Sequence, residues 1–90
     1  MEIIIHTVAH SFCPKDGVVE TNILGLFKNE ENARKCFETQ KTEEMKYAKQ
    51  YGWEIYADEE HYFEAGEDGN FNNHFSILSW YQEKMEIVSN

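Results

Sequence analysis

One segment of this chain has the features of a long, well-capped helix, and it separates two regions rich in strand-forming residues. Asn29 occupies an N-cap position, and two glutamates follow in the first turn, where the helix dipole favours negative charge. Gly52 suits the left-handed conformation that ends many helices. At about 100° per residue, one stripe holds Ala33, Cys36, Phe37, Gln40, Glu44, Tyr47, Ala48 and Tyr51. We therefore predict a helix over residues 30–51.

Two polar residues interrupt this mainly apolar stripe. Gln40 and Glu44 lie in its middle, where a buried core favours apolar side chains. Either the second half of the helix leaves the sheet and is solvated, or these two side chains face a partner that offers polar groups. The sequence leaves both interpretations open.

The residues on either side of the helix are typical of antiparallel strands. β-Branched and aromatic residues predict strands over residues 3–9 and 18–27, and again over 53–57, 61–65 and 71–81. Asp68-Gly69 predicts a two-residue hairpin turn that places His74 opposite Phe63, and residues 83–90 are expected to add a short edge strand or to fray. The order ββαββ predicts a single domain over residues 1–90. Its fold class is α+β, an antiparallel sheet of four to five strands with one long helix.

Both faces of the predicted strands are apolar. Ile3 and Ile5 point away from Ile4 and Val8 in the first strand. In the second strand one face is expected to carry Val19, Ile23 and Phe27, and the opposite face Val18, Leu24 and Leu26. One helix covers only one face of a sheet, so we expect the other face to meet a second copy of the chain, in a homodimer, or a different partner. A sheet that curls upon itself and buries both faces is the alternative.

The stretch between Lys49 and Lys84 contains no lysine or arginine, yet it holds eight acidic and nine aromatic residues. Unbalanced carboxylates attract basic surfaces, and aromatic side chains supply contact area. We expect an acidic hairpin in this stretch to bind a basic surface of another protein through Asp58, Glu59, Glu60, Tyr62, Phe63, Glu64, Glu67 and Asp68. The alternative is that these acids only keep a small domain soluble.

The overall charge narrows the classes of partner. A formal net charge of −9 argues against direct nucleic-acid binding, which depends on lysine and arginine, and against anionic membrane surfaces. No segment reaches transmembrane length and the N-terminal sequence lacks a signal-peptide pattern, so we expect a cytoplasmic location. Cys13 and Cys36 are too few for a disulfide framework, and we expect reduced thiols.

Two patterns that suggest metal binding have simpler explanations. His6 and His10 lie about 13 Å apart if the first strand is extended, too far to share an ion with Cys13. The run from Asp68 opens like a calcium loop but lacks the glycine and the glutamate required at its sixth and twelfth positions. We therefore expect no metal and no cofactor.

The sequence offers little support for an enzyme. The five glycines form no phosphate-binding loop, and no residue pattern marks a nucleophile together with its base and an oxyanion donor. We therefore expect no catalytic residues. A small enzyme or a protein that sequesters a nucleotide or other small molecule, using His61 and His74, is the alternative function.

Residues 23–33 carry a loose resemblance. A strand ending in Gly-x-Phe, a capped turn and a helix with an early alanine resemble a pattern common in short proteins of phages and other mobile elements. Such proteins often act as inhibitors, among them anti-CRISPR and other anti-defence proteins, immunity proteins and nucleic-acid mimics. The resemblance implies an inhibitor that blocks a basic site on a partner protein, and it assigns no functional residue.

Overall fold

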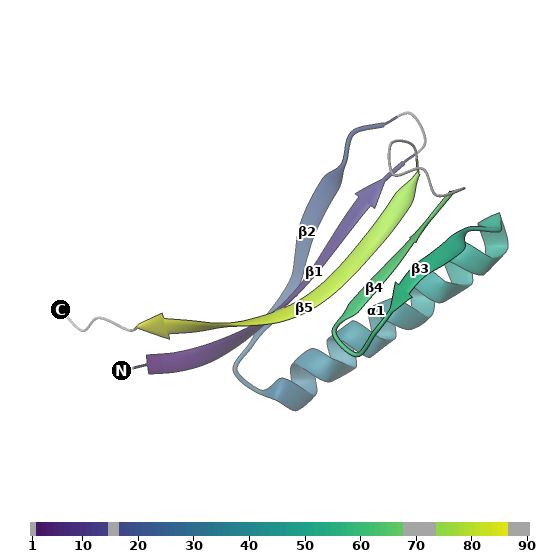
Figure 1. The fold of residues 1–90 in the computed structure, drawn as a ribbon. Coiled ribbons are helices and arrows are strands. Elements are labelled where there is room, and N and C mark those ends of the chain that lie inside the picture. The colour runs from purple at the N-terminus through teal and green to yellow at the C-terminus, as the bar shows by residue number, and fades with distance from the viewer. Residues whose placement is uncertain (1, 15–16, 68–73, 87–90) are drawn as a thin grey trace.

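The computed structural model describes residues 2–14, 17–67 and 74–86, and it has the predicted α+β fold (Figure 1). Five antiparallel strands form one sheet: β1 (Glu2–Cys13), β2 (Glu20–Phe27), β3 (Glu54–Asp58), β4 (Tyr62–Gly66) and β5 (Phe75–Glu86). The helix is α1 (Glu30–Tyr51), with the bounds predicted from the sequence. The order across the sheet is β2-β1-β5-β4-β3, so α1 connects the two edge strands.

Capping interactions explain why α1 begins and ends where it does. The side-chain oxygen of Asn29 accepts hydrogen bonds from two N–H groups of the first turn, at 2.8 and 3.2 Å. Gly52 adopts the left-handed conformation with φ of 67°, and the next N–H group, that of Trp53, donates to the carbonyl of Ala48 at 2.8 Å. These bonds satisfy backbone groups that a helix terminus otherwise leaves unpaired.

The core lies between α1 and one face of the sheet. Its buried members are Val8, Ala33, Phe37, Ala48, Trp53, Phe63, Ala65, Leu78 and Trp80. Side chains alternate along a strand, so the even-numbered residues of β1 and β5 and the odd-numbered residues of β4 face α1. We call the opposite side of the sheet the open face. Because β2 and β3 remain as separate edges, the sheet does not curl into a closed structure that buries both faces.

A β-bulge in β2 changes which of its residues share a face. Leu24 has no residue opposite it in β1. Phe27 packs against the core, whereas Ile23 and Leu26 both line the open face. The prediction that Ile23 shares a face with Phe27 is therefore wrong, because one extra residue in a strand inverts the alternation beyond it.

The two central strands are longer than predicted. β1 continues to Cys13, beyond its predicted end at residue 9, because the added residues pair with the first part of β5. Residues 83–86 extend β5 at the centre of the sheet instead of forming an edge strand. The other strands begin one or two residues later than predicted. The paired ends of β1 and β5 run past α1 as a two-stranded ribbon (Figure 1).

The register between β4 and β5 also differs from the prediction. Phe63 lies opposite Leu78, not His74, and Gly66 pairs with Phe75. The connection between β4 and β5 is therefore longer than a two-residue turn. The expected turn residues themselves, 68 and 69, lie outside the described residues. No helix in the described ranges is long and apolar enough to cross a membrane.

Candidate functional site

Acidic residues at the end of β3 and in the turn after it form ion pairs with α1. Asp58 forms an ion pair with Lys41, and Glu60 forms one with Arg34 at 3.2 Å. Lys41 also donates a hydrogen bond to the backbone carbonyl of Glu59 at 3.3 Å. Basic residues of the same chain therefore already neutralise part of the negative charge that the sequence offers to a partner.

Consecutive residues of β4 point to opposite sides of the sheet. Phe63 has no exposed surface and belongs to the core, which corrects the expectation that it contacts a partner. Tyr62 and Glu64 lie half-buried on the open face. Burial, and then the adjacent Glu64 carboxylate, raises the pKa of the Tyr62 hydroxyl, which stays protonated and donates to that carboxylate. Asp68, also expected in the site, lies outside the described residues.

The two histidines considered for an enzymatic or ligand-binding site lie at opposite ends of β4. His61 stacks on Trp80, with 3.9 Å between the ring centroids and 6° between the planes. His74 meets the ring of Trp53 edge-on at 4.4 Å, and its Nδ1 lies 3.6 Å from a carboxylate oxygen of Glu67. Each imidazole therefore packs against a separate part of the molecule, and the fold does not bring them together.

The histidines and the cysteine of β1 point to different sides. His6 and His10 face α1, whereas Cys13 lies on the open face. His6 accepts a hydrogen bond at Nδ1 from the indole of Trp80 at 3.3 Å. Among the residues that the structure describes, no three histidine, cysteine or acidic side chains gather as metal ligands.

A buried polar network occupies the centre of the interface between α1 and the sheet. The carboxylate of Glu44 accepts a hydrogen bond from Ser76 at 2.6 Å and another from Gln40 at 2.8 Å. Nε2 of His10 lies 3.0 Å from the same carboxylate and 2.7 Å from the Ser76 hydroxyl oxygen. Glu44 therefore faces the sheet, where β1 and β5 supply polar groups to it, and the partly buried Gln40 donates to Glu44 from the preceding turn of the helix.

The chemistry of this network is structural. Burial alone raises the pKa of Glu44, but hydrogen bonds from His10, Ser76 and Gln40, together with the charge on His10, outweigh it and leave the pKa below its usual value. Because Ser76 gives its hydrogen to Glu44, the histidine nitrogen donates to the serine oxygen and does not act as its base. Ser76 is also fully buried, so no substrate reaches it.

The open face presents a concave apolar patch over β2, β1 and β5. It is lined by the six apolar side chains Ile3, Ile5, Ile23, Leu26, Tyr81 and Met85, together with Thr7 and Glu83. Leu26 is 67% exposed, Ile23 54% and Met85 50%. Contiguous apolar surface of this kind, on a sheet face without a covering layer, is typical of an interaction site.

Charge on the open face has one sign. Glu54, Glu64 and Glu83 alternate with the residues that face α1 and therefore lie on the open side. The basic residues in the described ranges lie elsewhere: five on α1, Lys28 in the turn before it, and Lys84 on the α1 side of β5. Within the described residues, the sheet thus separates a negatively charged apolar face from a side that carries the lysines and the arginine.

The predicted site and the apolar patch share no residue. The sequence did contain a signal, since both faces of the strands were apolar, but it did not show which residues form the uncovered face. Among the members of the predicted set that the structure describes, Tyr62 and Glu64 lie on the open face, at the side of the patch.

Comparison with protein families and with curated proteins gives no match for the sequence, and comparison with solved structures gives none for the fold.

Proposed function

We propose that this protein is a small binding domain whose open face docks on an apolar and basic surface of another protein. The observation that carries this proposal is the apolar patch, in which exposed Ile23, Leu26 and Met85 lie beside the acidic Glu83. Among the described residues, no basic side chain lies on that face. Apolar side chains supply contact area, and the carboxylates favour a partner of opposite charge.

Inhibition by blocking is the mode of action that we favour. Carboxylates of Glu54, Glu64 and Glu83 on a broad sheet face would stand where a basic surface holds phosphate groups or an acidic substrate. This mode accords with the class implied by the resemblance to small phage and mobile-element proteins. The proposed contact surface is the open face and not the β3–β4 hairpin, because Asp58 and Glu60 of that hairpin form ion pairs with α1.

Capture from a lysate of the source organism, followed by mass spectrometry, tests the proposal. We expect the double variant Tyr81→Lys/Glu83→Lys to lose the protein that the wild type retains, because it places two positive charges on the patch. Ile4→Lys is the matched control, since Ile4 is 46% exposed but lies on the α1 side of β1. The double variant should bind the captured protein at least about tenfold more weakly than the wild type does. The affinity of the wild type for this protein should fall as the salt concentration rises. Equal capture by all three proteins would remove the open face from the proposal.

The edge of β2 supports the expected homodimer. Residues 20–27 contain no lysine or proline, the residues with which proteins commonly protect an edge strand, and Ile23 and Leu26 are exposed. We propose that two copies pair β2 with β2 in antiparallel fashion, which leaves the open faces accessible. Sedimentation equilibrium at micromolar concentration should give twice the monomer mass of 10.6 kDa. Ile23→Lys should give the monomer mass and Ile4→Lys should not; a monomeric wild type would exclude the dimer.

A further inference from the structure

The side of the sheet that faces α1 is only partly covered. Five strands about 4.8 Å apart span about 19 Å, whereas a helix with its side chains is about 10 Å across. α1 contacts β1, β2, β5 and, to a lesser extent, β4, whereas β3 is the edge strand beyond β4. Space for a second element therefore remains on this side of the sheet, above β3.

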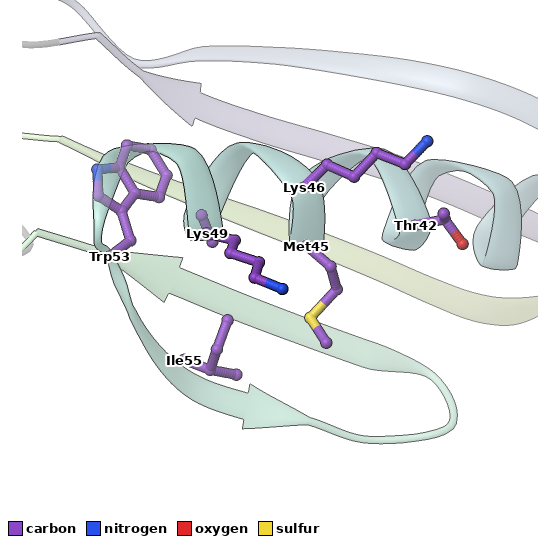
Figure 2. Close-up of a pocket in the computed structure, with 7 residues that line it drawn as sticks. Thr42, Met45, Lys46, Lys49, Trp53 and Ile55 are labelled. Carbon is purple, nitrogen blue, oxygen red and sulfur yellow. The ribbon is translucent and has the colours of Figure 1, made fainter.

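That space forms an apolar groove of about 630 Å³ between the second half of α1 and β3 (Figure 2). Met45 from α1 and Ile55 from β3 point toward one another across it, and the ring of Trp53 lies at one end. Met45 is 39% exposed and Ile55 44%. Concave sites lined by exposed apolar side chains are typical binding sites.

The groove also carries positive charge. The Lys49 ammonium group extends over it between Met45 and Ile55 (Figure 2). Lys49 has no ion pair in the described part of the chain, and Lys46 pairs only with the exposed Glu43 at 3.7 Å. An occupant with carboxylates beside apolar side chains would complement both properties.

We propose that this groove binds an acidic amphipathic helix of a partner protein, which lies beside α1 as the second helix on the sheet. Apolar side chains at helical spacing fill the space between Met45, Trp53 and Ile55, and flanking carboxylates contact Lys46 and Lys49. A helix satisfies its own backbone, so it needs only side-chain complementarity. The groove lies above the face of β3 and not along its free edge, which disfavours an added strand.

A designed peptide of about 16 residues, roughly 24 Å of helix, is the probe. It carries leucines on one face, glutamates on the flanks and a fluorescent label; a second peptide replaces the glutamates with lysines. We expect the full-length protein to bind the acidic peptide about tenfold more tightly than the basic one. Ile55→Glu should weaken this binding about tenfold, and Lys46→Glu/Lys49→Glu should reverse the preference between the peptides.

Two controls and a map of amide chemical shifts locate the binding. Lys35→Glu changes a lysine about 20 Å away along α1 and should leave binding of the acidic peptide unchanged. Tyr81→Lys/Glu83→Lys on the open face should also leave it unchanged, so the groove and the open face are tested independently. Shifts in the wild type should cluster on residues 42–55. The proposal would be overturned by equal binding of both peptides or by shifts confined to the open face. It would also be overturned if the fatty acid dodecanoate shifted the amide signals of the groove while the acidic peptide did not bind.

Discussion

Replacing Phe63 with alanine is expected to lower the free energy of unfolding by about 3–5 kcal/mol. The ring is fully buried beneath α1 and on the side of the sheet away from the open face, so its removal leaves a cavity. Small domains have a total stability of about 5–15 kcal/mol, so this loss is a large part of it. Urea denaturation gives the free energy, and thermal melting should show a decrease of more than about 10 °C.

Tyr62→Ala is the matched control for Phe63→Ala, because the two residues are adjacent in β4 but point to opposite sides of the sheet. We expect Tyr62→Ala to cost much less stability, since its side chain is only half-buried. A contact on the open face would instead make Tyr62→Ala the variant with weaker partner binding. Similar stability of the two variants would contradict the assignment of Phe63 to the core.

Replacing Glu44 with alanine is expected to lower the free energy of unfolding at pH 7 by about 3 kcal/mol. The carboxylate accepts hydrogen bonds from Ser76 and Gln40 and lies beside His10, so its loss leaves the buried Ser76 hydroxyl and the partly buried Gln40 and His10 without their acceptor. Glu43→Ala, on the exposed side of the same helix turn, should change stability by less than about 0.5 kcal/mol.

The contribution of Glu44 should depend on pH in a defined direction. Its pKa is lower in the folded state than in the unfolded chain, because the hydrogen bonds from His10, Ser76 and Gln40 outweigh the effect of burial. The stabilisation is therefore complete above the unfolded pKa of about 4.3 and is lost as the pH falls through the folded pKa. Glu44→Gln removes the titrating carboxylate, so the stability of the wild type relative to this variant should decrease as the pH falls below about 4.3. A difference that is independent of pH down to acid unfolding would contradict the lowered pKa.

Local signals predicted the helix and the order of the strands. Asn29 and Gly52 are adjacent in sequence to the backbone groups that they cap, so the bounds of α1 could be predicted directly. The bulge at Leu24 could not, because its position depends on the pairing of β2 with β1. The length of β1 depends in the same way on β5, which lies far along the chain.

The functional residues were harder to predict because their surroundings come from distant segments. In the sequence, Glu44 is a polar residue in an apolar stripe. The structure shows that its partners are His10 of β1 and Ser76 of β5. Asp58 and Glu60 were unbalanced acids in a segment without bases, yet Lys41 and Arg34 of α1 lie next to them in space. Charge balance along a chain therefore did not give charge balance on the surface.

The central position of β5 has a consequence for the order in which the chain acquires its structure. β5 lies between β1 and β4, so without it the sheet consists of two separate hairpins, β1–β2 and β3–β4. The pairing of Glu2 with Glu86 joins the two ends of the described chain. Contacts between residues so distant in sequence slow folding, and strands that await a late neighbour expose unpaired edges. During synthesis, β1 and β4 therefore remain without their central neighbour until residues 75–86 leave the ribosome.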